Sequence, residues 1–208
     1  MGFLDSILKG LFRLFKKKQA SIGIYGPPNA GKTTLANRIS RDWTGKPMGK
    51  TSEIPHETRR AKERKEVVIK AAGNKISFDI IDTPGIATKI DFHNFVEEFE
   101  MDEVKAKQRA KEATEGVIEA IKWLDKVDGV LLVMDSAEDP FNQVNVTLLG
   151  NLEARNLPTI IVANKMDLEN ASPATIRDAF PQHHTIPISA LAGYGMDNLY
   201  KAMLKYFR

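Results

Sequence analysis

Gly26 to Thr33 form a short segment whose residue types suit the binding of phosphate groups. The segment reads Gly-Pro-Pro-Asn-Ala-Gly-Lys-Thr and matches the pattern G-x-x-x-x-G-K-[ST]. Glycines allow the chain to wrap tightly enough for its backbone amides to converge on an anion, and the amino end of a following helix adds positive potential. Lys32 would place a charge on the outer phosphates, and the Thr33 hydroxyl would ligate Mg²⁺. The alternative interpretation is a glycine-rich turn that precedes a helix by chance.

Asp82-Thr83-Pro84-Gly85 is a second candidate for contact with phosphate and metal. It follows residues 75–81, an apolar run that we expect to be a strand. Asp82 could hold magnesium through water. The backbone amide of Gly85 could donate a hydrogen bond to the γ-phosphate, and that bond would exist only with a triphosphate bound. Such a contact would let the protein distinguish a nucleoside triphosphate from the diphosphate.

A further magnesium ligand is expected from residues 43–60, which contain several glycines and prolines and predict a long loop. Thr58 is the favoured candidate in this loop, and Thr51 is the competing one. The expected metal site therefore combines Thr33, Thr58 and Asp82.

Asn164-Lys165-Met166-Asp167 carries residue types that can recognise a guanine base. A carboxylate at Asp167 can accept hydrogen bonds from N1–H and the 2-amino group of guanine. Adenine offers no such pair of donors, so it would leave the carboxylate unsatisfied. The apolar stem of Lys165 can lie over the base, and a backbone amide of Ser189-Ala190-Leu191 can reach the guanine oxygen. Taken alone, the first of these segments could also be an exposed polar loop.

The elements that must position these residues are indicated by short apolar runs that alternate with helical stretches. Six runs are expected to be strands, and they span residues 22–25, 66–71, 75–81, 129–134, 158–163 and 185–188. Helices are expected over residues 32–41, 141–156, 173–180 and 194–207, with a further helix through Ile118, Ile121 and Leu124. The second and third strands would form a hairpin around Gly73-Asn74. The alternation predicts an α/β fold with three layers, in which a mostly parallel six-stranded sheet has helices on both faces.

Length and composition limit the class of protein. A chain of 208 residues with 42% hydrophobic residues can fill one core. The absence of cysteine excludes disulfides and cysteine-ligated metal sites. No apolar run is long enough for a transmembrane helix, and the N-terminus lacks the pattern of a secretory signal. We therefore expect a cytoplasmic protein.

Residues 1–19 differ from the rest of the chain in charge and in periodicity. Apolar residues recur on one helical face, and they are Phe3, Leu4, Ile7, Leu8, Leu11, Phe12 and Phe15. Five Lys or Arg residues stand against Asp5 alone, and three of them form the cluster Lys16-Lys17-Lys18. We expect a basic amphipathic helix that lies on an anionic membrane surface through residues 1–18. The alternative is a helix that packs on the rest of the protein or on another subunit.

Together these motifs resemble the Era/TrmE-like group of translation-factor-related P-loop GTPases. The resemblance covers residues 20–208, an Era-like GTPase domain, and includes the five motifs of the group in order: GPPNAGKT, Thr58, DTPG, NKMD and SAL. Asn29 in the phosphate loop and Arg59 after the switch threonine agree with the group. The residues that flank Thr58 depart from its usual paired threonines. Era also carries a C-terminal RNA-binding KH domain, and we expect none in this sequence.

The resemblance implies that the chain binds GTP and GDP and hydrolyses GTP slowly, with Lys32, Asn29 and Thr58 taking part in catalysis. Ile86 stands where Ras-like enzymes place a glutamine that orients the attacking water, so charge compensation must come from elsewhere. In potassium-stimulated members, the residue that matches Asn29 helps to hold K⁺ against the phosphates. The alternative is that Asn29 is a loop residue suited to a turn. The implied nucleotide contacts are Gly26, Pro27, Pro28, Asn29, Ala30, Gly31, Lys32, Thr33, Thr34, Asp82, Gly85, Asn164, Lys165, Asp167, Ser189, Ala190 and Leu191.

We therefore expect a GTPase that acts as a nucleotide-dependent switch on an effector protein, with Mg²⁺ and K⁺ as its cations. Its place would be the cytoplasm or the surface of a membrane. Two alternatives stay open: a nearly inactive GTP-gated binding module, and a ribosome- or RNA-associated factor. Binding to nucleic acid is not expected without a partner, because the positive net charge is concentrated in residues 1–19. The effector and the oligomeric state are left open.

Overall fold

The computed structural model describes residues 19–48, 61–71, 73–86, 96 and 102–207. The expected N-terminal helix over residues 1–18 and the two candidate magnesium ligands Thr51 and Thr58 lie outside the described residues. Within these ranges, no helix has both the length and the apolar character that crossing a membrane requires.

In the described part of the chain, six strands form one sheet in the order β2-β3-β1-β4-β5-β6. Neighbouring strands are parallel except for β2 and β3, which are antiparallel. The strands are β1 (Gln19–Tyr25), β2 (Lys62–Ala71), β3 (Asn74–Asp82), β4 (Gly129–Asp135), β5 (Thr159–Asn164) and β6 (His184–Pro187). The central apolar runs form strands because both of their faces are covered, and every residue from Gly129 to Met134 in β4 is buried. The expected six-stranded, mostly parallel sheet is confirmed.

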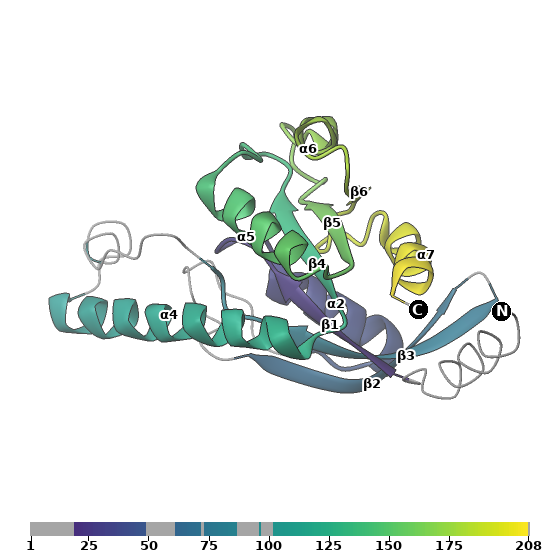
Figure 1. The fold of residues 1–208 in the computed structure, drawn as a ribbon, viewed down its shortest axis with the longest axis horizontal. Coiled ribbons are helices and arrows are strands. Elements are labelled where there is room, and N and C mark those ends of the chain that lie inside the picture. Colours follow the sequence, from purple (N-terminus) through teal and green to yellow (C-terminus); the bar gives the residue numbers. More distant parts are fainter. Residues whose placement is uncertain (1–18, 49–60, 72, 87–95, 97–101, 208) are drawn as a thin grey trace, which may run out of the picture.

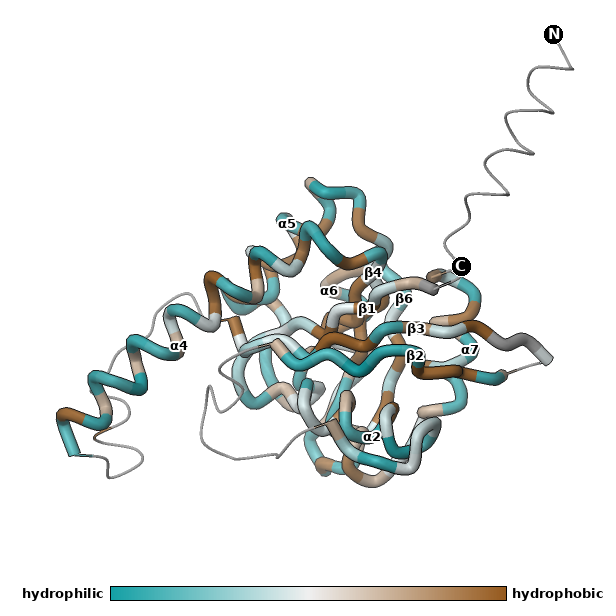
Figure 2. Tube along the Cα trace, turned by 90° about the horizontal axis from the view of Figure 1, so that it is seen from below, coloured by the Kyte–Doolittle hydropathy of each residue, from teal (hydrophilic) through white to brown (hydrophobic). Residues whose placement is uncertain are grey.

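Helices cover both faces of this sheet (Figure 1). They are α2 (Lys32–Thr44), α4 (Glu103–Trp123), α5 (Gln143–Ala154), α6 (Pro173–Ala179) and α7 (Met196–Tyr206), with a 3-10 turn η1 (Leu124–Lys126) after α4. On one face, α2 and α7 bury Leu35 and Met203 in one apolar cluster. On the other face, α4, α5 and α6 bury Ala120, Leu148 and Ile176 in a second cluster. The three layers that the sequence predicts are therefore present, and hydrophobic residues follow the central strands in Figure 2.

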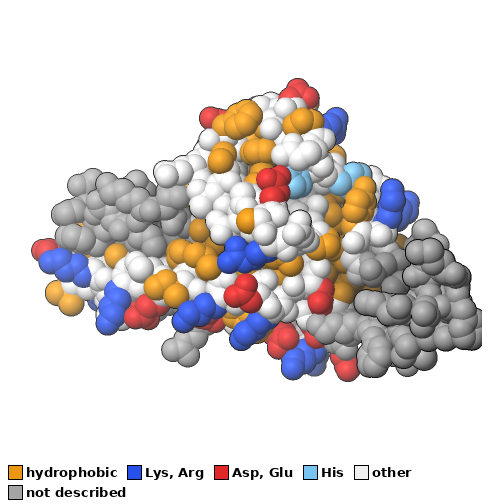
Figure 3. Space-filling view, viewed as in Figure 1, with side chains coloured by type: hydrophobic (Ala, Val, Ile, Leu, Met, Phe, Trp, Pro, Cys, Tyr) orange, Lys and Arg blue, Asp and Glu red, His pale blue; other side chains and the backbone are white. Residues whose placement is uncertain are grey.

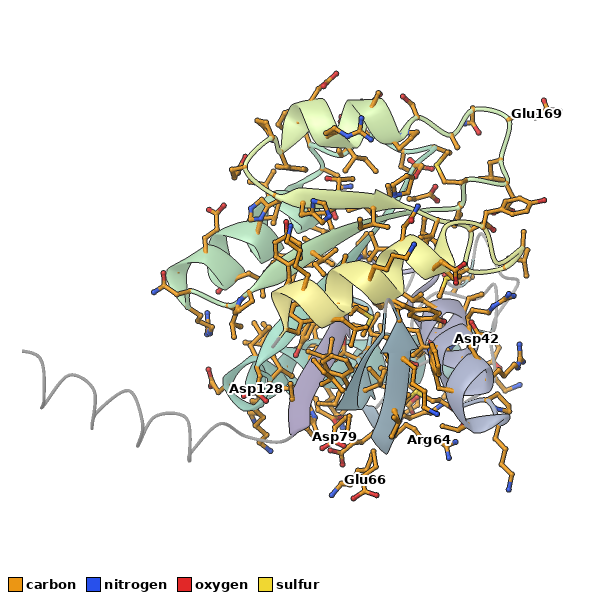
Figure 4. The ribbon with its side chains drawn as sticks, turned by 90° about the vertical axis from the view of Figure 1, so that its right-hand side faces the viewer. Asp42, Arg64, Glu66, Asp79, Asp128 and Glu169 are labelled. Atoms are coloured by element: carbon orange, nitrogen blue, oxygen red, sulfur yellow. The ribbon has the colours of Figure 1, made fainter. Side chains whose placement is uncertain are left out.

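The edge strand β2 begins earlier than the sequence predicts. A strand is expected from residue 66, whereas β2 starts at Lys62. Its first four residues are all charged, so they show no apolar alternation, yet the first three pair with the end of β3. The register shifts between Arg64 and Val67, where Glu66 has a φ of 56° and its amide donates to Asp79 Oδ1 at 2.9 Å (Figure 4). The predicted antiparallel hairpin is confirmed, and its outer strand is longer than expected, with charged residues of the kind that edge strands tolerate.

The long helix α4 reaches beyond the sheet at its N-terminal end, and charged side chains of both signs line its outer side (Figures 1 and 3). The side chain of Asp102 caps this end. The C-terminal half packs on the body through Ala120, and Val117 and Trp123 lie against the same apolar cluster. Ile118 and Ile121, which the sequence places in this helix, are 50% and 43% exposed. The small residues are buried instead, because they let the helix approach its neighbours closely.

Candidate nucleotide-binding site

The loop between β1 and α2 follows a course that glycine makes possible. Gly26 and Gly31 have φ values of 147° and 93°. A Cβ atom would lie 2.2 Å from the carbonyl oxygen of Val133 at Gly26, and 2.3 Å from Asn164 Nδ2 at Gly31. Asn29 also has a positive φ, 58°, in a region that asparagine enters more readily than most residues. These close approaches and left-handed turns fix the tight course that a phosphate-binding loop needs.

Lys32 lies at the start of α2, and little of it is exposed to solvent. The residue is 6% exposed, and its ammonium donates to the carbonyl oxygen of Pro27 at 2.6 Å. Burial lowers the pKa of Lys32 to about 8, and the nearby charge of Asp82 opposes this shift. The ammonium is therefore held within the loop, where phosphate oxygens would stabilise its charged form.

Asp82 and Thr33 bring oxygen atoms together beside Lys32. Thr33 Oγ1 donates a hydrogen bond to Asp82 Oδ2 at 2.8 Å. Asp82 is fully buried, and its Oδ1 has no hydrogen-bond partner in the described part of the chain. Burial raises the pKa of this carboxyl, while the Thr33 hydrogen bond and the charge of Lys32 oppose the rise. A buried carboxyl with an unsatisfied oxygen and a neighbouring hydroxyl fits Mg²⁺, which prefers oxygen ligands.

Gly85 and Ile86 lie directly against the phosphate loop. A Cβ atom at Gly85 would lie 3.0 Å from Pro28 Cα and 3.2 Å from Lys32 Nζ. The amide of Ile86 donates to the carbonyl oxygen of Gly26 at 3.2 Å. The side chain of Ile86 is buried in the apolar cluster under α4. It therefore offers no polar group to a water molecule near the phosphates.

Asn164, the first residue of the expected base motif, connects the two halves of the site. It is the last residue of β5 and is 3% exposed. Its Nδ2 donates to the carbonyl oxygen of Ala30 at 2.9 Å, and its Oδ1 accepts from the amide of Ala190 at 3.0 Å. One side chain thus joins the phosphate loop to the loop that follows β6.

Asp167 is oriented by the loop that follows β6. Ser189 Oγ donates to Asp167 Oδ1 at 2.5 Å, and the same hydroxyl accepts from the amide of Ala192 at 2.9 Å. The Asp167 carboxylate and the Ala190 amide come from loops after different strands. Ser189 and Asn164 hold these two groups near each other, as contact with one edge of a guanine base requires.

Lys165 makes a contact that the motifs do not predict. Its Nζ lies 2.6 Å from Oδ2 of Asp135. Asp135 is the last residue of β4, which is the neighbour of β5 in the sheet. Its place directly after the apolar run 129–134 is the signal that could have identified it, because ligands of parallel sheets bind at the carboxyl ends of the strands.

The structure brings the described residues of the four motifs together at the carboxyl ends of the strands. Thr34 lies in the first turn of α2, and Leu191 is 75% exposed. Thr58 lies outside the described residues, so its expected place in the site is a prediction. Over the described ranges, no three His, Cys, Asp or Glu side chains gather into a metal site. A magnesium ion at Thr33 and Asp82 would therefore take further ligands from phosphate and water.

Comparison with known proteins relates this arrangement to one family. Residues 21–165 match the family described as 50S ribosome-binding GTPase. A protein named GTPase Era, from Geobacter sp. (strain M21), is 31% identical over 191 residues, which cover 88% of this chain and 54% of that protein. A tRNA modification GTPase MnmE, from Synechococcus sp. (strain CC9605), is 31% identical over 189 residues, which cover 88% of this chain and 33% of that protein.

A solved structure shares the fold. The crystal structure of Era in complex with MgGDPNP and nucleotides 1506–1542 of 16S ribosomal RNA has a TM-score of 0.68 and 25% sequence identity. The alignment covers 91% of this chain and 57% of the Era chain. This chain thus spans about half the length of the Era proteins that it matches.

Proposed function

Because this chain belongs to the 50S ribosome-binding GTPase family, we propose that residues 20–208 form a GTPase domain that binds GTP with Mg²⁺ and hydrolyses it to GDP. The two nucleotide forms would bind an effector protein differently, so that the domain acts as a molecular switch. Residues 1–19 would form a separate amphipathic arm that holds the switch at an anionic membrane surface in the cytoplasm.

The proposal rests above all on Asn164, which joins a phosphate half of the site to a base half. The phosphate half contains Lys32 and the hydrogen-bonded pair of Thr33 and Asp82. The base half contains Asp167, held by its hydrogen bond from Ser189. A nucleoside triphosphate has phosphates at one end and a base at the other, so a fixed spacing between the two halves suits this ligand.

Hydrolysis would depend on groups that hold the γ-phosphate rather than on a base that activates water. The Lys32 ammonium and the Gly85 amide would donate to its oxygens and stabilise the charge that develops on them. Thr33 and Asp82 would hold Mg²⁺, which when bound neutralises charge on the β- and γ-phosphate oxygens. The buried side chain of Ile86 supports slow turnover, because this position offers the attacking water no polar group.

We further propose that K⁺ supplies part of the missing charge compensation beside Asn29. This residue lies in the phosphate loop, and its amide oxygen is a suitable ligand for a monovalent cation. The positive φ of Asn29 is equally consistent with an asparagine that only adopts the left-handed conformation of the turn. The rates of GTP hydrolysis in potassium and in sodium therefore have to decide whether Asn29 is a K⁺ ligand or only a turn residue.

The experiment that tests the proposed function measures binding of a fluorescent GDP derivative and turnover of radiolabelled GTP by the full chain with Mg²⁺. Lys32→Ala should abolish or greatly weaken tight triphosphate binding, because the outer phosphates lose their cationic partner. Lys122→Ala changes an exposed lysine on α4 and serves as the matched control. Parent-like turnover by Lys32→Ala would show that the phosphate loop has been assigned wrongly.

Experiments on the same purified full chain distinguish the proposed switch from two other functions. GTP that stays bound and unhydrolysed through purification would favour a nearly inactive GTP-gated binding module, which the position of Ile86 supports. Tight binding of the full chain to a ribosomal RNA fragment would favour a ribosome- or RNA-associated factor, for which the support is the family and the RNA bound in the Era structure.

A further inference from the structure

We propose that Asp135 is a positioning residue of the guanine site, which holds Lys165 so that its apolar stem forms one wall for the base. The inference rests on the proposed nucleotide site and adds to it a residue outside the four motifs. Its basis is the ion pair of 2.6 Å between Lys165 Nζ and Asp135 Oδ2.

The backbone around Asp135 places its carboxylate beside Lys165. Asp135 pairs with Asn164 in the register of β4 and β5. The next residue, Ser136, donates its amide to the carbonyl oxygen of Asn164 at 2.9 Å. Asp135 Oδ1 accepts from the amide of Ala137 at 3.0 Å, which fixes the carboxylate and leaves Oδ2 for the lysine. The carboxylate is therefore oriented by its own strand and turn.

Lys165 is fixed at its other end by the backbone. Its φ is 66°, a left-handed conformation that is uncommon for lysine. The carbonyl oxygen of Lys165 accepts from the amide of Leu168 at 3.0 Å, so a turn holds this conformation. Because both the backbone and the ammonium are held, the four-carbon stem loses much of its freedom before a nucleotide arrives. Such preorganisation favours binding, since less order has to be imposed when the base enters.

The surroundings of the pair indicate a role in binding rather than in folding. The side chains of Lys165 and Asp135 are 32% and 13% exposed, so water screens their attraction in part. The pair lies at the carboxyl end of the sheet, outside the two apolar clusters. Loss of the carboxylate should thus free the lysine without disturbing the core.

The test measures the dissociation constant of fluorescent GDP for the full chain and for four variants. Asp135→Asn should weaken GDP binding by about five- to tenfold, the range for one charged hydrogen bond that is partly exposed. Lys165→Met keeps an apolar stem and removes the ammonium. The double variant should bind no more weakly than Lys165→Met alone, because Asp135 would act only through that ammonium.

The matched control is Asp125→Asn, the fourth variant. Asp125 also forms an ion pair, at 3.4 Å to Arg155, and its side chain is 74% exposed. This substitution should leave the dissociation constant of GDP unchanged. Thermal unfolding of the nucleotide-free variants should give midpoints close to that of the parent for both aspartate substitutions.

A base-free probe distinguishes positioning of the base from a general effect on the site. Magnesium pyrophosphate should displace fluorescent GDP from Asp135→Asn with the affinity that it has for the parent, because the phosphate half is unchanged. Equal weakening of GDP and pyrophosphate, or parent-like GDP binding by Asp135→Asn, would overturn the role of Asp135. Failure of the parent chain itself to bind GDP would instead overturn the proposed function.

Discussion

At the scale of single residues, the Asn164 amide makes the phosphate and base contacts depend on each other. Its nitrogen donates to Ala30 and its oxygen accepts from Ala190. An aspartate in this place would offer two acceptors and set one of them against the carbonyl oxygen of Ala30. Movement of either loop would therefore disturb the contacts of the other, and nucleotide binding should stabilise both loops together.

Asp167→Asn should weaken GDP binding and favour xanthine diphosphate relative to GDP. An amide can accept from guanine but also presents a donor, and the lost charged hydrogen bond is worth about 1.5–3 kcal/mol. Calorimetric titration with both diphosphates measures the change. Glu169→Gln, at an exposed acid two residues further on (Figure 4), is the control. Parent-like GDP affinity in Asp167→Asn would remove this carboxylate from the base site.

Potassium should accelerate GTP hydrolysis relative to sodium, and removal of the Asn29 side-chain amide should abolish the difference. Asn29→Gly is the suitable substitution, because glycine accepts the φ of 58° without strain. Rates are compared in KCl and NaCl at matched ionic strength. The same rate in both salts for the parent chain would favour charge compensation by a partner protein.

At the scale of elements, the C-terminal half of α4 contacts Tyr25 and Ile86, which adjoin the phosphate loop, and Ala61, which precedes β2. Tyr25, directly before the phosphate loop, donates its hydroxyl to the carbonyl oxygen of Ala120 at 3.0 Å. The amide of Ala61, directly before β2, donates to Glu119 Oε1 at 3.0 Å. Ile86 packs in the same apolar cluster as Ala120. If nucleotide exchange moves any of these three segments, its contact with α4 would therefore change as well.

Tyr25→Phe should lower the stability of the fold and leave GDP affinity near that of the parent. The Tyr25 hydroxyl is a protonated donor at neutral pH, and burial raises its pKa further. Loss of this buried hydrogen bond should cost about 1 kcal/mol, which lowers the Tm by about 2–4 °C in a protein of this size. Thermal unfolding followed by fluorescence measures the shift. Tyr206→Phe, at a more exposed tyrosine, should leave the Tm unchanged.

The elements differ in how clearly the sequence marks them. Apolar runs located β4 and β5 to within one residue at each end, because strands buried on both faces need such runs. The charged first part of β2 lacks that signal. The start of α4 at Glu103 also lacks an apolar signal, since four of its buried residues are Ala or Gly and the fifth is Arg109.

In the candidate site, too, some residues can be predicted from the sequence and others cannot. The phosphate and base motifs are recognisable because a nucleotide requires particular residue types at particular spacings. Contacts that only orient those residues depend on which strands are neighbours, and one sequence does not state the strand order. The contact between Asp135 and Lys165 is of this kind, so the motifs predict a role for Lys165 and none for Asp135.

At the scale of the whole molecule, residues 1–18 should bring the protein to anionic vesicles. Their apolar face can enter the lipid headgroup region, and each Lys or Arg near an anionic surface contributes about 1 kcal/mol. The full chain should sediment with phosphatidylserine-containing vesicles at low salt, and a chain without residues 1–18 should stay in the supernatant. Replacing Lys16, Lys17 and Lys18 by glutamine should weaken sedimentation without changing GDP affinity.

Neutral vesicles provide the control for the charge contribution. If the full chain stays in the supernatant with anionic vesicles in both its GTP and GDP forms, the membrane role is wrong. Packing of residues 1–18 on the protein or on another subunit would then be the better account of their apolar face.

The charged start of β2 also affects how molecules of this protein meet in concentrated solution. An outermost strand presents unpaired amide and carbonyl groups, to which a strand of another molecule can add. The run Lys62-Glu63-Arg64-Lys65 surrounds these groups with hydrated charges, and the irregularity at Glu66 interrupts the flat ladder that a second strand would need. An added strand would have to displace that water and still meet a broken ladder. The charged run 62–65, which gives this strand no apolar pattern in the sequence, thereby reduces its tendency to aggregate edge to edge.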